Sequence, residues 1–290
     1  MKVREPALDG VPQVGKLKKK PKKRRFRGIK LLLTVLLLGS ALVLLALSPF
    51  FNISAVKVSG GQHYNPEDII QSANLPVGEN GFKTLGKNIG SVKNVQKFVT
   101  LRCALAEDAV MNHRPYIKTA KVKYVLPGTF DINITERKPI GFVPYTGTNL
   151  IIDDEGFVLD TVNKPTAGTN PVIKGLEFEN YELGQALKIK NTLGFETVLK
   201  TQQVLRDSEE QGNIKLSAPI NSIDVSDLSR VCLLVDSRIT VNFGDVYYLS
   251  YEELLYRINF FKQVFTKNLK KQDKGLLDFT MGDNPKFIPQ

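Results

Sequence analysis

The chain has 290 residues, of which 42% are hydrophobic, and its formal net charge is +11. This charge does not indicate a nucleic-acid-binding domain, because it is concentrated at one end. Residues 1–30 contain twelve Lys/Arg and two Asp/Glu, whereas the rest of the chain contains 28 and 27. A basic block next to an apolar segment is more typical of a topology signal that also contacts anionic lipid than of a nuclear or nucleic-acid signal, which is the weaker alternative.

The apolar segment runs from Leu31 to Phe51, twenty-one residues without a charge. At about 1.5 Å per residue, a helix of this length spans roughly 30 Å, the thickness of a bilayer's hydrocarbon core. We therefore predict a transmembrane helix over 29–51, with a cytoplasmic N-terminus because the basic residues precede it. A cleaved signal peptide is the alternative, since Ala46 and Ser48 are small, but the apolar run is long and Pro49 follows.

The residues before the predicted helix, 1–28, are rich in lysine and have little to bury, which predicts a disordered cytoplasmic tail that can contact membrane lipids. The two cysteines, Cys103 and Cys232, do not have metal-ligand spacing. Each lies in an apolar pattern, so we expect two separate buried thiols. A disulfide between them is the alternative.

Residues 52–138 show alternating and helical periodicities in the order β-α-α-β-β. A short strand ends at Gly60, and Asn65 and Pro66 are an N-cap and a first helical residue. A longer helix is predicted from apolar residues on one face: Val92, Val95, Val99, Cys103, Ala106 and Val110. Two strands, 117–125 and 130–136, then flank a turn at 126–129.

Residues 139–284 are predicted to be mostly strands. Hairpins are expected at 150–159 and 231–243, with a helix near 195–208. Ser250 and Glu253 form a capping box that begins a C-terminal helix. A last strand is predicted over 276–281, and residues 285–290 are expected to be a short tail.

These elements resemble the FtsQ/DivIB family of bacterial cell division proteins, which have a basic tail, one membrane helix, a POTRA domain and a β domain. The resemblance is carried by two strings, Pro115-Tyr-Ile117-Lys-Thr-Ala120-Lys-Val122 and Leu126-Pro127-Gly-Thr129-Phe130-Asp-Ile132-Asn-Ile134-Thr-Glu136-Arg137-Lys-Pro139. It implies an α+β fold with a POTRA domain at 52–138 and a β domain at 139–284. The chain departs from the family pattern in the segment Gly81 to His113, which is longer than expected.

The resemblance also implies a non-catalytic scaffold of the divisome at the division septum, which supports septal peptidoglycan synthesis. It implies binding of the extracytoplasmic parts of FtsB/DivIC and FtsL, and contacts with other divisome membrane proteins. The family's contact region maps here to the last helix and last strands: Tyr251, Tyr256, Leu277, Phe279, Met281 and Phe287. Because half of these side chains must face the core, each one is a candidate contact only.

Glu136 and Arg137 lie where the two predicted domains meet. Arg137 either anchors this joint through an ion pair or ends a strand in solvent, and we favour the joint.

Chemistry-bearing residues are sparse. His63 and His113 lack a metal-like spacing, and Asp153, Asp154 and Glu155 lie between two apolar runs, which is typical of a turn. We therefore expect no catalytic, metal or cofactor site. Two alternatives stay open: a membrane-anchored enzyme acting on lipid-linked cell-wall precursors, and a POTRA-bearing component of a secretion or outer-membrane assembly system. The latter would be expected to carry a barrel or repeated POTRA units, and the sequence shows neither pattern.

Overall fold

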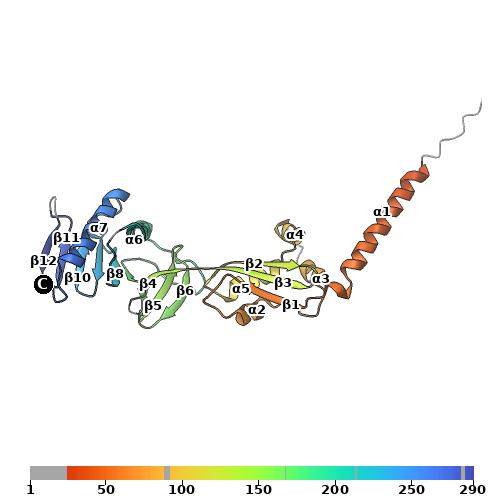
Figure 1. The fold of residues 1–290 in the computed structure, drawn as a ribbon, viewed down its shortest axis with the longest axis horizontal. Helices are drawn as coiled ribbons and strands as arrows, with labels where there is room; N and C mark the ends of the chain where they lie inside the picture. Colours follow the sequence, from red (N-terminus) through yellow and green to blue (C-terminus); the bar gives the residue numbers. More distant parts are fainter. Residues whose placement is uncertain (1–24, 88–91, 167, 213, 282–284) are drawn as a thin grey trace, which may run out of the picture.

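The computed structural model describes residues 25–87, 92–166, 168–212, 214–281 and 285–290. The molecule is elongated, with an N-terminal helix at one end and the C-terminus at the other (Figure 1). Between them lie two sheets, each with its own helices. The basic tail expected over 1–28 falls almost entirely outside the described residues.

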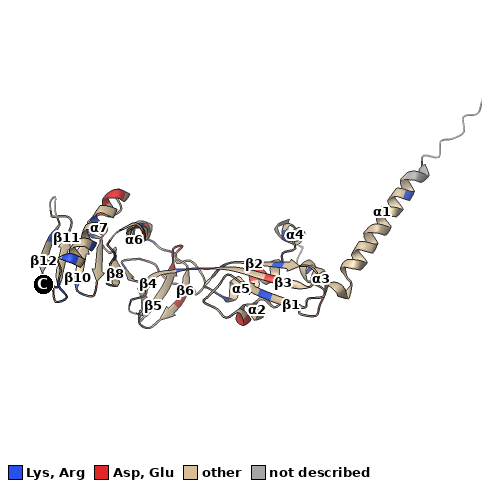
Figure 2. Ribbon diagram, viewed as in Figure 1, with Lys and Arg blue, Asp and Glu red and all other residues tan. Residues whose placement is uncertain are grey.

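The N-terminal helix, α1 (Arg25–Ala46), is the predicted membrane span. Its stretch Gly28–Ala46 is long and apolar enough to cross a bilayer, and none of it is buried against the rest of the protein. Most of α1 is free of charged residues (Figure 2). The helix ends five residues earlier than expected, because Pro49 begins a separate 3-10 turn, η1 (Pro49–Phe51), whose Pro has no backbone N–H to continue the helix.

The first sheet has the strand order β1-β3-β2. Strand β1 pairs parallel with β3, and β2 pairs antiparallel with β3. The elements are β1 (Ala55–Ser59), α2 (Pro66–Ala73), α3 (Gly81–Gly86), α4 (Val92–Val99), α5 (Ala104–His113), β2 (Ile117–Val125) and β3 (Thr129–Glu136). Alternate side chains of β2 and β3, among them Val122, Tyr124 and Ile132, are buried against the helices.

The long helix predicted through Val92 to Val110 is two helices in the structure. The chain leaves the helical path at Leu101, which has a φ of 56°. Tyr124 N donates to Leu101 O at 2.7 Å, and Cys103 N donates to Val122 O at 2.8 Å. The break therefore lets residues 101–103 pair with the outer edge of β2, which satisfies backbone groups that an uninterrupted helix would leave open.

The second sheet has nine strands in the order β12-β11-β10-β9-β8-β7-β4-β5-β6. Its strands are β4 (Pro139–Tyr145), β5 (Thr148–Asp153), β6 (Val158–Val162), β7 (Val172–Lys174), β8 (Ile220–Asp224), β9 (Cys232–Val235), β10 (Ile239–Asn242), β11 (Gly275–Asp278) and β12 (Lys286–Pro289). A short 3-10 turn, η2 (Leu228–Arg230), precedes β9. Helices α6 (Thr192–Gln211) and α7 (Tyr251–Lys267) cover the upper side of the sheet in Figure 1.

Aliphatic side chains of the second sheet, such as Ile223 and Val241, form a separate core with α6 and α7. The expected α+β fold with one N-terminal apolar helix is confirmed. Cys103 is buried in the first core and Cys232 is half-buried in the second sheet, and both thiols are free. Residues 285–290 differ from the expected tail, because they contribute β12 to the sheet.

Candidate functional site

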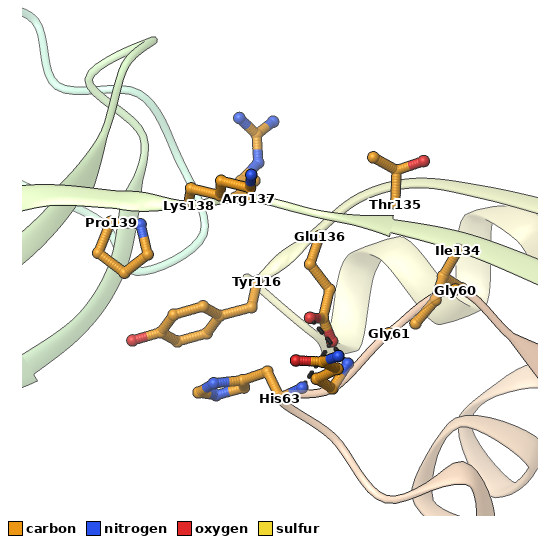
Figure 3. A pocket seen from close by; sticks show the side chains of 11 residues that line it. Gly60, Gly61, His63, Tyr116, Ile134, Thr135, Glu136, Arg137, Lys138 and Pro139 are labelled. Carbon is orange, nitrogen blue, oxygen red and sulfur yellow. Dashed lines mark hydrogen bonds between the residues drawn. The ribbon is translucent and has the colours of Figure 1, made fainter. Parts of the chain in front are cut away.

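The connection between the two sheets is made by Arg137 and Lys138, between the end of β3 and the start of β4. Glu136 and Arg137 point to opposite sides of this extended segment (Figure 3), as neighbouring residues of a strand do. Arg137 Nη1 lies 2.6 Å from Asp153 Oδ2 and 2.6 Å from Glu155 Oε2. Its guanidinium carbon lies 3.8 Å from the centre of the Phe157 ring.

These contacts place Arg137 against the turn that joins β5 to β6. The Asp153 side chain is fully buried, and its Oδ1 also accepts hydrogen bonds from the backbone N–H groups of Glu155 and Phe157. The acidic residues predicted to form a turn therefore do so, and two of them, Asp153 and Glu155, bind the Arg137 side chain. From the first sheet, Lys118 Nζ lies 3.0 Å from Glu155 Oε1. The hydrogen bond from Arg137 and that from Lys118 lower the pKa of Glu155.

On the other side of the segment, Glu136 borders an open groove of about 850 Å³ (Figure 3). Its two carboxylate oxygens accept hydrogen bonds from Gln62 N at 3.0 Å and His63 N at 2.9 Å. The His63 ring stacks on Tyr116 at 3.7 Å, and burial raises the pKa of Tyr116 to about 12. Glu136 therefore binds the loop after β1 to the end of β3, while its neighbour Arg137 binds the turn between β5 and β6 of the second sheet.

The second candidate region is the far end of the nine-stranded sheet. Of the predicted contact residues, Tyr256 is 63% exposed and Met281 is 46% exposed, whereas Leu277 and Phe279 are buried. The Phe279 ring stacks on Phe243 at 5.4 Å. Sequence periodicity alone did not separate the exposed members of this set from the buried ones.

The other two predicted residues lie at the margins of this region. Tyr251 lies at the start of α7, and its hydroxyl group donates a hydrogen bond to Asp207 Oδ2 on α6 at 2.8 Å. Phe287, in β12, is half-buried opposite Leu277 of β11. Tyr256 also borders a groove of about 360 Å³ between the end of α6 and the face of α7.

The outermost strand of this end is β12, and it has no second neighbour among the described residues. Gln290 N donates to Lys274 O at 2.9 Å, and hydrogen-bonded pairs alternate along an antiparallel ladder. With the register Leu276↔Ile288 and Leu277↔Phe287, the backbone groups of Phe287 and Pro289 point away from β11. Because proline has no N–H, the free edge offers carbonyl groups and the Phe287 N–H, which suits a short pairing strand.

Two exposed residues of the second sheet's outer parts were not predicted. Ile288 of β12 is exposed, and Tyr248, just before Ser250, the N-cap of α7, is 82% exposed. The sequence feature that corresponds to β12 is the apolar pair Phe287-Ile288 between two prolines. Two residues are too few to predict a strand from alternation. Within the described part of the chain, no group of three or more His, Cys, Asp or Glu side chains could hold a metal ion.

Comparison with known proteins shows which proteins this chain is similar to. Residues 83–137 match the POTRA domain of the FtsQ type. Two proteins named cell division protein DivIB, from Clostridium botulinum strains Loch Maree and Hall, are 24% and 26% identical to 92% of this chain, and the matches cover 94% of each relative. A cell division protein FtsQ from Streptomyces collinus is 29% identical over 52% of this chain and 51% of its own length.

This chain resembles the FtsQ/DivIB proteins over most of its length. The FtsQ-type match begins within α3, covers α4, α5, β2 and β3, and ends at Arg137. This match therefore includes residues 83–113 of the segment Gly81 to His113, whose described residues form three short helices. The partner-binding residues and the domain boundary at 138/139 stay predictions.

Proposed function

We propose that this chain is a single-pass membrane scaffold of the bacterial divisome, with its N-terminus in the cytoplasm and both sheets outside. In this proposal it binds the extracytoplasmic parts of FtsB/DivIC and FtsL and supports septal peptidoglycan synthesis without catalysing it. The observation that carries the proposal is the similarity of 92% of the chain to proteins named cell division protein DivIB. The apolar helix α1 and the basic residues before it support the topology.

The proposed contact surface is the β12 end of the second sheet. An extended segment of a partner can pair with the free backbone groups of Phe287 and Pro289, since an exposed edge strand binds by adding a strand to the sheet. Ile288 on β12 and Met281 after β11 offer exposed apolar area at this end of the sheet, and Tyr256 offers more on α7. Leu277 and Phe279 are buried, so in this proposal they shape the surface and do not contact the partner directly.

The proposal is tested with the full chain in lipid nanodiscs, titrated calorimetrically with the DivIC ectodomain of the same organism. We expect Met281→Asp, Ile288→Asp and Tyr256→Asp each to weaken binding by about tenfold or more, the equivalent of about 1.4 kcal/mol, because each places a charge in an apolar contact. The matched control is Leu183→Asp, since Leu183 is exposed and its neighbour Gly184 donates to Val158 O of β6, the opposite edge of the sheet.

Binding that Leu183→Asp weakens as much as Met281→Asp would contradict the position of the surface. Absence of binding by the unchanged chain, with the FtsL ectodomain also present, would contradict the scaffold proposal. It would direct attention to the alternative of an enzyme acting on lipid-linked precursors.

A further inference from the structure

The end of α1 is tied to the first sheet's domain by one side chain. Asn80 Nδ2 donates to Ala46 O at 2.9 Å and to Ser48 O at 3.1 Å. Ala46 is the last residue of α1, and the last carbonyl groups of a helix have no partner within the helix. The Asn80 Oδ1 atom simultaneously accepts from Lys83 N at 3.1 Å and caps α3. A single amide thus joins the start of α3 to the end of α1.

The same end of the domain gathers three segments that are distant in sequence. Ile53 N donates to Glu79 O at 2.8 Å, and Gly78 N donates to Ile53 O at 2.8 Å. Ser54 N donates to Gly128 O at 2.7 Å. The residues after α1 are therefore held between the loop before α3 and the turn that joins β2 to β3.

Each of these segments exposes an apolar side chain. We call the following four residues the apolar collar: Leu47, Phe50, Val77 and Leu126. Phe50 is 69% exposed, Val77 is 63% exposed, and about half of the surface of Leu47 and Leu126 is exposed. Large apolar side chains exposed together at one end of a domain are typical of a site that contacts a protein, a ligand or a membrane.

The position of the collar next to the end of α1 favours the membrane among these partners. Gly28–Ala46 is the stretch that can cross a membrane, and at about 1.5 Å per residue its 19 residues span about 28 Å, close to the thickness of the hydrocarbon core. The end of α1 then lies at the bilayer surface, and Leu47 and Phe50 follow within four residues. Aromatic and apolar side chains at this depth are favoured by the lipid interface.

We propose that the apolar collar is inserted into the lipid interface of the extracytoplasmic leaflet. With the Asn80 hydrogen bonds, this contact holds α1 and the first sheet's domain as one unit at the membrane surface, so that the domain does not swing freely on a tether. The inference rests on the membrane anchoring proposed above, and it assigns the bilayer, not a protein, as the occupant of this surface.

The test uses the full chain in phospholipid vesicles, in a Cys232→Ser background that leaves only the buried Cys103. An environment-sensitive fluorophore is attached at Val77→Cys or Leu126→Cys, with Leu183→Cys as the control. Leu183 is similarly exposed and apolar but belongs to the second sheet's region. Resistance of the protein to alkaline extraction is measured first, and quenching by nitroxide-labelled lipid second.

We expect the probes at positions 77 and 126 to show a blue shift and a loss of emission with the labelled lipid, and the probe at 183 to show neither. If the protein is retained in the vesicles but the probes at 77 and 126 are not quenched, the insertion of the apolar collar is wrong while the membrane anchoring by α1 stands. Protein extracted by alkali would overturn both. A blue shift at 77 and 126 without lipid quenching would also overturn the inference, because it would mean that a protein covers the collar.

A second variant tests the tie to α1. Asn80→Asp keeps an acceptor for Lys83 N but cannot donate to Ala46 O or Ser48 O. We expect α3 to stay capped and the lipid quenching at position 77 to decrease, because the domain is no longer held to the helix end. Quenching equal to that of the parent would overturn the role of Asn80.

Discussion

Arg137 makes hydrogen bonds to residues of both sheets' domains. It follows the last residue of β3, its backbone N–H donates to Tyr116 O at 2.7 Å, and its guanidinium reaches two carboxylates of the second sheet. Its side chain is 11% exposed and that of Asp153 is fully buried, so the pair is shielded from solvent. A buried carboxylate that loses its cation is costly.

We expect Arg137→Ala to lower the free energy of unfolding by about 2–3 kcal/mol, below the full cost of an unpaired buried charge because Asp153 keeps two backbone donors. The measurement is chemical denaturation of the full chain in detergent micelles. The matched control is Lys118→Ala, which removes an exposed contact with Glu155 and should cost less than about 1 kcal/mol. Equal losses from the two variants would contradict the anchoring role of Arg137.

Glu155 should make this connection sensitive to acid. Arg137 and Lys118 hold its pKa below the ordinary value of 4.5, so the unfolded chain binds more protons than the folded one as pH falls below that value. The stabilisation is therefore present above pH 4.5 and is lost as pH decreases through the lowered pKa. We expect the thermal unfolding midpoint to fall less steeply below pH 4.5 in Glu155→Gln than in the unchanged chain. Parallel profiles would contradict this contribution.

At the scale of elements, α6 and α7 are joined by a buried cation. The side chain of Lys262 on α7 is fully buried, and its Nζ donates to Ser208 O at 2.8 Å and lies 2.8 Å from Glu209 Oε1. Ser208 is in the last turn of α6, where free carbonyl groups and the helix dipole favour a positive charge. This contact positions the helix face that carries Tyr256 in the proposed partner surface.

We expect Lys262→Ala to lower the free energy of unfolding by about 2–4 kcal/mol, because it leaves a cavity and unpaired acceptors. Lys262→Met should cost less, since it loses the hydrogen bonds and the ion pair with Glu209 but fills a similar volume. Thermal unfolding followed by circular dichroism measures both. A Lys262→Ala variant as stable as the unchanged chain would show that α6 and α7 do not depend on this contact.

In the molecule as a whole, the two sheets have separate hydrophobic cores, which share no residue within the described parts of the chain. They are connected by the β3–β4 segment and by the contacts of Arg137 and Lys118. Such an arrangement favours unfolding of one part while the other stays folded.

We expect Ile132→Ala, at a fully buried position in the centre of the first sheet, to cost about 2–5 kcal/mol and to speed hydrogen exchange in β1, β2 and β3 only. The matched variant Ile223→Ala, fully buried in the second sheet, should act on the second sheet only. Exchange that rises in both sheets for either variant would mean that the molecule unfolds as one cooperative unit.

Features that depend on local pattern were predictable from the sequence alone. The charge-free run predicts the apolar helix, and alternation predicts β2 and β3. Ser250 is the N-cap of α7, with Glu253 N donating to Ser250 Oγ at 3.1 Å, although the Glu253 carboxylate accepts from Arg257. The sequence predicts these features because the periodic spacing of buried residues and the hydrogen bonds of a helix's first turn involve residues that are close in sequence. The same reasoning identified Arg137 but not its partners, which lie 16 and 18 residues away.

Features that depend on contacts between distant segments required the folded structure. Leu101 leaves the helical path because β2 offers unpaired backbone groups, and Phe287 and Ile288 form a strand because β11 is beside them. Likewise, Asn80 meets the end of α1 only after the first sheet has formed. In each case, the deciding hydrogen bond joins segments whose proximity no local pattern encodes, so the sheet edges and the joint became visible only in the folded chain.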